Sequence, residues 1–305
     1  MKTILFVKTS SLGDVVHNCP AVSDAARALP GAAIDWIVEE PFAGIAAMHR
    51  AVRRVIPVAM RRWRATLWRP EVWAEIRAWR RELRRERYDA VIDSQALVKS
   101  ALISALALGE RHGMDRASAR ESLAAVFYQV RHAVPPELHA VERNRLLAAA
   151  ALRYEVDHPP DYGLRVPEAD MSGCVVLLTM TSRADKLWPE ERWIELGRGL
   201  RAPAILPWGS AAERARAERI AAAIGGTVPP SQDLEGLARL FVAARGVVGL
   251  DTGLTHLAAA LGVPTVGIYC GSDPTLTGLY SAPHARNIGA LGRPPEIGEV
   301  LRMLA

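Results

Sequence analysis

The stretch GLDTGLTHLAA, residues 249–259, decides the fold because it joins two kinds of predicted secondary structure through a few small residues. The apolar run before Asp251 predicts a buried strand, and the alanine- and leucine-rich residues after Gly253 predict a helix. A strand that leads through a short polar turn into a helix is the unit from which α/β folds are built. The stretch therefore predicts a parallel sheet, with Asp251, Thr252 and His256 at the end of one of its strands.

The same alternation extends outward through the whole chain. After Pro70, apolar side chains recur at helical spacing and share one face of a predicted helix. These side chains are Val72, Ile76, Trp79 and Leu83. The predicted strands are residues 4–7, 34–38, 53–58, 89–93, 174–180, 203–209, 246–251 and 265–269. The pattern predicts an α/β protein with parallel sheets and helices on both faces.

The alternation occurs twice, and a break separates the two series. Residues 157–173 are rich in proline, aspartate and glycine, which is typical of a linker. We expect a Rossmann-like domain over residues 1–165 and a second one over residues 166–305, with the last helix a candidate to pack back on the first domain. Two doubly wound domains that face each other hold ligands at the carboxyl ends of their strands. The informative residues are therefore those that follow strands.

Composition excludes several classes of protein. No run reaches the roughly 18–20 apolar residues that cross a bilayer, and the first residues are too short for a signal peptide, so we expect a cytoplasmic protein. Cys19, Cys174 and Cys270 are odd in number and far apart, which argues against disulfides and zinc. The net charge is +5, and residues 60–89 hold a dense basic block. Such a block suits an anionic partner, either nucleic acid, phosphorylated lipid or a membrane surface.

The turn KTSSLGDVVHNCPAV, residues 8–22, follows the first predicted strand. Ser10, Ser11 and Gly13 form a tight turn, and Asp14 falls at the start of a helix. Aspartate there commonly caps the helix, and a carboxylate at this edge of a sheet also suits a general base. The two interpretations both stand at this point. The turn matches neither the GxxxxGK[ST] phosphate loop nor the GxGxxG dinucleotide fingerprint.

Two turns in the second half have the composition of anion sites. Thr181, Ser182 and Lys186 follow the strand at 174–180, and hydroxyls with a lysine are the donors that a phosphate needs. Gly253 permits close approach to the backbone at a helix start, where N–H groups and the helix dipole favour anions. The alternatives are a solvated loop for the first turn, and a capping Asp251 with a satisfied surface His256 for the second.

The remaining polar segments have ordinary interpretations when each is taken alone. YCGSDPTLTGLY, residues 269–280, is typical of a loop, and the basic block is typical of a solvated amphipathic helix. Tryptophan beside arginine also suits a membrane interface. The basic and polar candidates in the first half are Arg61, Arg62, Arg64, Gln95, Lys99, Arg116 and Arg120.

Taken in order, the motifs resemble a known family. KTSSLGDVVHNCPAV, YDAVIDSQALVKSA, DRASARES, TSRADKLWPEERW, LPWGSAAE and DTGLTHLAAALGVPTVGIYCGSDP run through nearly the whole chain. Together they resemble the lipopolysaccharide heptosyltransferases, which are inverting GT-B glycosyltransferases of family nine. VIDSQALVKSA with DTGLTHL favours the heptosyltransferase I group. Heptosyltransferase II, or another GT-B transferase with a different nucleotide sugar, is the alternative.

The resemblance implies an activity and its partners. Members transfer L-glycero-D-manno-heptose from ADP-heptose to the Kdo of Kdo2-lipid A, with the acceptor on the N-terminal domain and the donor on the C-terminal domain. The resemblance also implies a peripheral protein on the cytoplasmic face of the inner membrane, where the anionic surface of the inner leaflet is an expected partner. No cofactor and no metal are expected. A nucleic-acid-binding protein is a rival interpretation of the basic block, but the sequence holds no motif of that class, and nucleic acid is not an expected partner. A non-catalytic nucleotide-binding module is a further rival, which would bind ADP without turnover.

The resemblance also implies roles for individual residues. Asp14 matches the general base, with a pKa that a dry cleft would raise, and Lys186 matches the residue on the diphosphate. Glu213 falls where a glutamate contacts the ribose. The other implied donor residues are Thr181, Ser182, Asp251, Thr252, Gly253 and His256. Because Asp251 is too acidic to touch the phosphates directly, we expect it to cap the helix and to orient His256 or the glycine turn. The implied acceptor-side residues are Ser10, Gly13, Arg61, Arg62, Arg64, Gln95, Lys99, Arg116 and Arg120. One departure from the family is Ser182, where a second threonine is expected.

Overall fold

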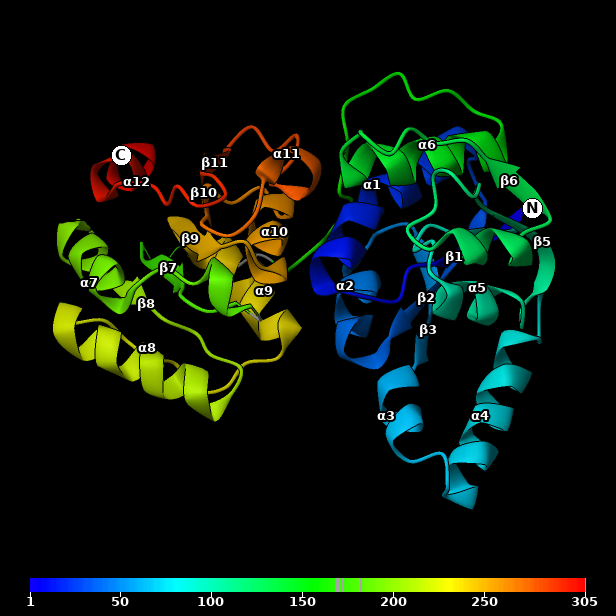
Figure 1. Cartoon of the computed structure of the whole chain (residues 1–305), viewed down its shortest axis with the longest axis horizontal. Coiled ribbons are helices and arrows are strands. Elements are labelled where there is room, and N and C mark those ends of the chain that lie inside the picture. The colour runs from blue at the N-terminus through cyan, green and yellow to red at the C-terminus, as the bar shows by residue number, and fades with distance from the viewer. Residues whose placement is uncertain (168–170, 172, 182, 305) are drawn as a thin grey trace. The chain divides into compact units, whose positions relative to one another are not determined.

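The chain divides into two compact units, Met1–Gly163 and Leu164–Ala305. The computed structural model describes residues 1–167, 171, 173–181 and 183–304 (Figure 1). The division falls inside the segment 157–173. In the part of the chain that is described, no helix combines the length and the apolarity that crossing a membrane requires.

Strands and helices alternate through the first unit. The strands are β1 (Thr3–Val7), β2 (Ala33–Glu39), β3 (Val52–Val58), β4 (Arg87–Asp93), β5 (Leu108–Met114) and β6 (Val130–His132). The helices are α1 (Leu12–Ala28), α2 (Ala43–Met48), α3 (Met60–Ala65), α4 (Pro70–Leu83), α5 (Val98–Ser104) and α6 (Ala140–Leu152), with 3-10 turns η1 (Glu40–Phe42) and η2 (Ser122–Phe127). Every strand pairing in this sheet is parallel.

The order of the strands places a binding edge in the first unit. The six strands run β3-β2-β1-β4-β5-β6, so the chain leaves β1 toward one side and later returns to pair β4 on the other. In such doubly wound sheets, ligands bind outside the carboxyl ends of the strands where the order reverses. Here that point lies between β1 and β4. The residues just after Val7 and Asp93 are therefore the ones positioned to act.

Side chains along the central strands point alternately to the two faces of this sheet, and helices pack against them. Leu5 and Val7 point to one face and pack in a cluster with Trp63 of α3, Val72 of α4 and Ile103 of α5. The two helices α1 and α6 pack against each other along their length (Figure 1). The apolar stripe predicted for residues 72–83 is confirmed, because it faces this core.

The second unit repeats the alternation with its own core. The strands are β7 (Val175–Leu178), β8 (Ala204–Ile205), β9 (Gly246–Leu250), β10 (Thr265–Tyr269) and β11 (Ala285–Gly289). The helices are α7 (Glu190–Gly199), α8 (Ala211–Ile224), α9 (Leu234–Ala243), α10 (Gly253–Ala260), α11 (Pro274–Thr277) and α12 (Ile297–Leu304), with the 3-10 turn η3 (Ala184–Lys186). Two buried tryptophans in edge-to-face contact, Trp188 and Trp193, sit in the core. The helix α12 packs on α7 within this unit.

The second sheet also has a reversal point. Its order is β11-β10-β9-β7-β8, and all its pairings are parallel. The order reverses between β7 and β9, which places the binding edge after Leu178 and Leu250. The predicted α/β fold, with two Rossmann-like parallel sheets, is confirmed. The strand expected at 203–209 is only two residues long, because the flanking Pro203 and Pro207 cannot donate to a strand ladder.

A buried ion pair ties α1 to α6 and gives a stability prediction. The guanidinium of Arg145 donates to Asp24 at 2.7 Å, and both side chains are almost wholly buried. We expect Asp24→Ala to lower the free energy of unfolding by about 3–5 kcal/mol, because the buried Arg145 guanidinium loses its buried carboxylate partner and keeps the partly exposed Glu142. Urea-induced unfolding measures this loss. The control is Arg85→Ala, which removes an exposed partner of Glu82 and should cost under about 1 kcal/mol. Equal effects of the two substitutions would contradict the prediction.

Candidate functional site

Asp14 lies on the first turn of α1, directly after the central strand β1. Ser11 is the N-cap of this helix, and the Asp14 carboxylate accepts a hydrogen bond from the Ser11 backbone N–H at 2.9 Å. Asp14 is therefore not the N-cap residue itself but its capping-box partner three residues on. Its side chain keeps 23% of its accessible surface, so one carboxylate can both support the helix and meet a ligand.

Two cations set the electrostatics of Asp14. Arg120 lies 3.4 Å from the carboxylate, and the Lys8 ammonium is buried below, donating to the Ser94 carbonyl at 2.8 Å. Burial acts to raise the pKa of Asp14, but the charges of Lys8 and Arg120 and the bonds from Ser11 hold it below its ordinary value. In this structure the pKa is thus lowered, contrary to the expected rise. Burial lowers the pKa of Lys8 to about 8.

The turn that carries Asp14 is held from the neighbouring strand β4. The side-chain carbonyl of Gln95 accepts from the N–H groups of Thr9 and Ser10 at 3.0 and 3.1 Å. Lys99 donates to the Ser10 hydroxyl at 2.9 Å. Gln95 is buried, so its oxygen acts within the protein to fix the turn. The structure thereby brings together Ser10, Asp14, Gln95, Lys99 and Arg120, which the sequence proposed separately.

The arginines of α3 connect to this edge through Glu39, which sequence reasoning missed. Glu39 ends β2; its backbone N–H bonds to the Thr9 carbonyl, and its carboxylate accepts from the Arg61 N–H at 2.8 Å. The Arg61 guanidinium lies over the Phe42 ring, and Arg62 pairs with Glu40 and Glu75. The other predicted acceptor-side arginines, Arg64 and Arg116, are exposed. Gly13 lies within the first turn of α1.

In the second unit, Asp251 is the centre of a polar cluster at the end of β9. Its carboxylate accepts from Lys186 and from the Ser272 hydroxyl, each at 2.5 Å, and lies 3.5 Å from His256. Burial acts to raise the pKa of Asp251, but hydrogen bonds from His256, Lys186 and Ser272 hold it far below its ordinary value. Asp251 is therefore a fixed anion that orients a lysine, a hydroxyl and an imidazole.

The expectation that Asp251 caps α10 is wrong. The N-cap is Thr252, and the helix begins at Gly253, so the Asp251 side chain is left to turn toward Lys186. The Thr181 hydroxyl donates to the Asp251 carbonyl at 3.4 Å, which joins the end of β7 to the end of β9. His256 is buried rather than on the surface. Ser272 lies in the loop after β10, for which the sequence predicts only an ordinary turn.

Ser182 and Glu213 are the two other residues predicted to contact the sugar donor. Ser182 lies outside the described residues. Glu213 lies on the first turn of α8, and its carboxylate accepts from the N–H groups of Gly209 and Ser210 at 2.7 and 3.2 Å. Glu213 thus forms a capping box with Ser210, the N-cap of α8.

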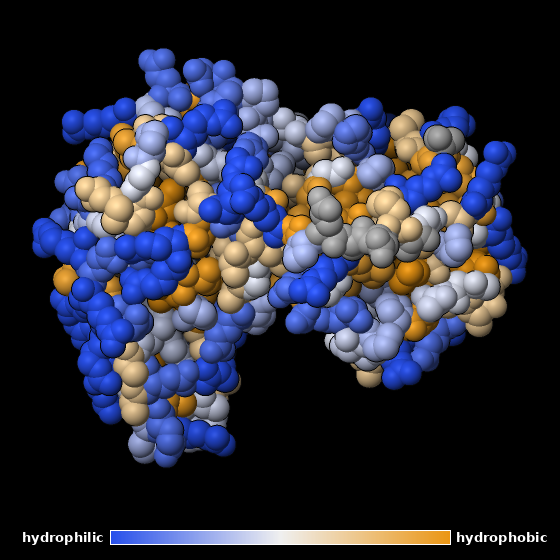
Figure 2. Space-filling view, turned by 180° about the vertical axis from the view of Figure 1, so that it is seen from behind, coloured by the Kyte–Doolittle hydropathy of each residue, from blue (hydrophilic) through white to orange (hydrophobic). Residues whose placement is uncertain are grey.

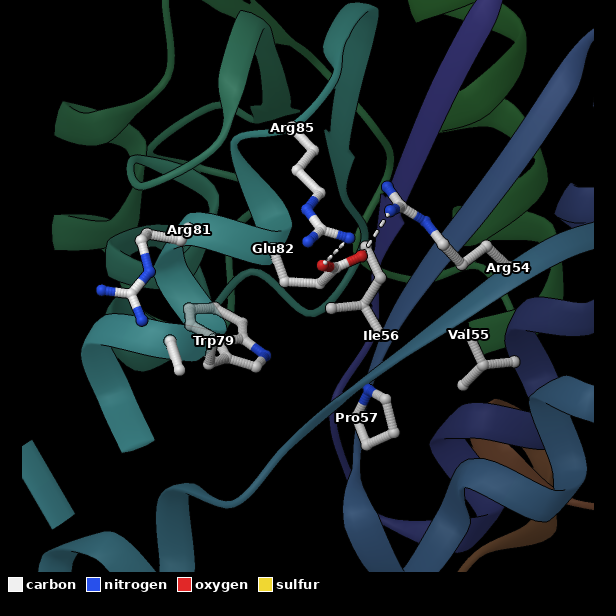
Figure 3. Close-up of a pocket in the computed structure, with 9 residues that line it drawn as sticks. Arg54, Val55, Ile56, Pro57, Trp79, Arg81, Glu82 and Arg85 are labelled. Carbon is white, nitrogen blue, oxygen red and sulfur yellow. Dashed lines mark hydrogen bonds and ion pairs between the residues drawn. The ribbon is translucent and has the colours of Figure 1, made fainter. Parts of the chain in front are cut away.

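A separate pocket of about 470 Å³ lies between α4 and the edge strand β3 (Figure 3). Arg54 and Arg85 both reach Glu82 in it, at 3.0 and 2.8 Å, while the Arg81 guanidinium points away from Glu82. The pocket is on an edge strand and not at the reversal of the strand order, so it is distinct from the polar cluster around Asp14. Within the described ranges, no three His, Cys, Asp or Glu side chains gather as metal ligands would.

Comparison with known proteins decides the family. A family model described as glycosyltransferase family 9 (heptosyltransferase) matches residues 76–301. The chain belongs to glycosyltransferase family 9. This family 9 chain is 47% identical over 291 residues to lipopolysaccharide heptosyltransferase 1 of Escherichia coli K12. The matched region covers 91% of this chain and 90% of the relative. It is therefore a glycosyltransferase, and its resemblance to heptosyltransferase I is confirmed.

Two solved structures extend the similarity of this family 9 enzyme to the fold. The E. coli heptosyltransferase WaaC with ADP matches with a TM-score of 0.93 and 43% identity, over 99% of this chain and 98% of that one. The same enzyme with ADP-2-deoxy-2-fluoro heptose matches with a TM-score of 0.90 and 42% identity, over the same shares. The GT-B assignment of the fold is thus confirmed.

Proposed function

We propose that this family 9 enzyme transfers L-glycero-D-manno-heptose from ADP-heptose to the Kdo of Kdo2-lipid A, in a single displacement that inverts the anomeric carbon. The observation that carries the proposal is the cluster of Lys186, Thr181 and His256 around Asp251. It lies at the reversal point of the second sheet, in a chain 43% identical to a heptosyltransferase solved with ADP. A nucleoside diphosphate is the ligand that fits these cationic and hydrogen-bond-donating groups.

The second unit is proposed to hold the donor and its leaving group. As the bond from heptose to phosphate breaks, negative charge gathers on ADP. An ammonium has three donors, so Lys186 can keep Asp251 and still bind a phosphate oxygen. The N–H groups at the start of α10 and the Thr181 hydroxyl add further donors. These protein groups, together with the Ser182 hydroxyl, carry the charge stabilisation in the proposed reaction. Glu213 is proposed to accept a hydrogen bond from the ribose of ADP.

The first unit is proposed to hold the acceptor and the base. Asp14 accepts the proton of the Kdo hydroxyl as that oxygen attacks. A base with a lowered pKa is ionised throughout the neutral range, so it is always ready to accept. Gln95 and Lys99 fix the turn that aims it. Arg61, Arg62, Arg64, Arg116 and Arg120 are proposed to meet the anionic groups of the acceptor, which is carried by the inner leaflet on the cytoplasmic side.

The role of Arg120 gives a prediction on pH dependence. Asp14 works as a base only when ionised, and its pKa is held down in part by Arg120, so activity is lost as the pH falls through that pKa. Arg120→Gln removes this charge and raises the pKa. We expect the acid limb of the kcat/KM profile to move to higher pH, while the neutral plateau also falls if the acceptor loses a contact. An acid limb that stays in place would show that Arg120 does not control Asp14.

The experiment that tests the proposal is ADP release from ADP-heptose with de-acylated Kdo2-lipid A. Turnover with this pair supports the proposal. ADP binding without turnover on this pair would instead support a nucleotide-binding module or a different sugar donor.

A further inference from the structure

The basic block of the first unit has an internal order that the proposed reaction does not use. The helices α3 and α4 form a hairpin that projects from the sheet of this unit (Figure 1). At its tip, Trp68 is 75% exposed and Leu67 is 41% exposed, and Trp73 beside them is 49% exposed. Large apolar side chains that are exposed together in this way mark a surface that meets another partner.

The charges on α4 are sorted into two stripes. One stripe holds exposed positions spaced by three and four residues, and so shares one face of the helix. It consists of Arg69, Trp73, Arg77, Arg80 and Arg84. The other stripe, Glu71, Glu75 and Glu82, lies on the opposite face at the same kind of spacing. The buried face, with Val72 and Leu83, lies between them.

Most of the acidic stripe is paired within this unit, since two of its three glutamates form ion pairs with arginines. Glu75 pairs with Arg62, and Glu82 pairs with Arg54 and Arg85. Figure 3 shows the two contacts of Glu82. Over the described part of the chain, no ion pair engages the four arginines of the basic stripe. The space-filling view shows this projection covered mainly by hydrophilic side chains, with apolar ones between them (Figure 2). The basic stripe therefore carries a net positive charge toward solvent.

The tip is prepared for an apolar environment. The indole N–H of Trp73 donates to the Leu67 carbonyl at 2.7 Å, so this ring can leave water without losing a hydrogen bond. The Thr66 hydroxyl bonds to the Arg62 carbonyl at 2.9 Å and closes the end of α3. The turn between the helices is thus fixed before any partner arrives, which lowers the entropy lost on binding.

We propose that the α3–α4 hairpin docks on an anionic lipid membrane, with Leu67, Trp68 and Trp73 entering the interface and the stripe of Arg69, Arg77, Arg80 and Arg84 on the lipid phosphates. The inference rests on the proposed function, since a lipid acceptor makes a membrane the expected surface. Nucleic acid would satisfy the arginines but not the exposed leucine that accompanies the two tryptophans. A lipid interface satisfies both, because aromatic rings favour the headgroup level and arginines bind phosphate.

Vesicle flotation of the full chain tests the docking without any acceptor present. The vesicles are phosphatidylcholine alone, or with about one quarter phosphatidylglycerol. We expect wild type to bind the anionic vesicles, and Arg77→Glu/Arg80→Glu/Arg84→Glu to weaken binding about a hundredfold or more, since each basic residue near the surface contributes about fivefold. Trp68→Ala should weaken it about tenfold, and more of the remaining binding should then be lost in salt.

A matched control separates the hairpin from net charge. Arg201→Glu/Arg245→Glu/Arg302→Glu changes the same number of exposed arginines in the second unit and should leave vesicle binding intact. Thermal melts check that every variant folds. Equal loss in both triple variants, or no effect of Trp68→Ala, would overturn the proposal. A DNA duplex that binds as tightly as the anionic vesicles and ignores Trp68→Ala would replace it with nucleic acid.

ADP release with the de-acylated acceptor keeps this inference apart from the proposed function. The triple hairpin variant should retain turnover within about twofold, because a soluble acceptor needs no membrane. If wild type binds anionic vesicles as expected but shows no turnover, the substrate proposal fails and the docking surface stands. If turnover is normal and the vesicles do not bind, the docking proposal fails alone.

Discussion

Replacing Asp14 by Asn is expected to lower kcat for heptose transfer by about 10³-fold or more, because an amide cannot accept the proton of the attacking hydroxyl. The substitution keeps the shape of the side chain and an oxygen that can accept the Ser11 N–H bond. The melting temperature should therefore change little, and ADP binding should persist. Steady-state ADP release and a thermal melt measure the two effects on the same sample.

Asp14→Ala is the companion variant, because it removes the helix-capping bond as well. It should lose as much activity as the Asn variant, and in addition about 0.5–2 kcal/mol of stability. The pair of variants separates the two roles of this carboxylate. Turnover that survives in the Asn variant would show that the carboxylate supports the helix only, and that the base lies elsewhere.

Replacing Lys186 by Ala is expected to lower kcat by about 10²–10³-fold and to weaken ADP binding, because the charge that develops on the leaving group loses its cationic partner. The folded chain should tolerate the change, since Asp251 keeps bonds from Ser272 and His256. Single-turnover kinetics and ADP titration measure the two losses.

The neighbouring Arg183 provides the control for Lys186. Arg183 is exposed and paired with Asp185, two residues away. Arg183→Ala removes a positive charge from the same loop, so it should change kcat by less than about threefold if position rather than net charge matters. Similar losses in the two variants would assign the effect to the charge of the loop as a whole.

The fold could be predicted where apolar runs are continuous and buried. β1, β2, β4, β9 and β10 were found in this way, because a central parallel strand is covered on both faces. β5, with the sequence LGERHGM, was missed because its outer position leaves room for polar side chains. β6 and β11 lie at the edges of their sheets and lack a sequence signal for the same reason.

The site could be predicted as a set of positions but not as a set of contacts. The rule that ligands bind after parallel strands singles out Asp14, Lys186 and Asp251 as candidates from the sequence alone. It could not show that Lys8 is buried beneath Asp14, which is why the direction of the pKa shift was wrong. Nor could it show that Ser272 reaches Asp251 from another loop, since that contact depends on tertiary packing.

The carboxylate of Asp251 has a consequence for the end of the catalytic cycle. In the proposed reaction Lys186 must attract ADP strongly in the transition state and still let the product go. Because Asp251 stays beside the ammonium, it acts as an intramolecular competitor of the departing phosphate, and the product-free enzyme is not left with an isolated cation. In the proposed reaction, the Asp251 carboxylate is therefore expected to favour release of ADP and to limit product inhibition.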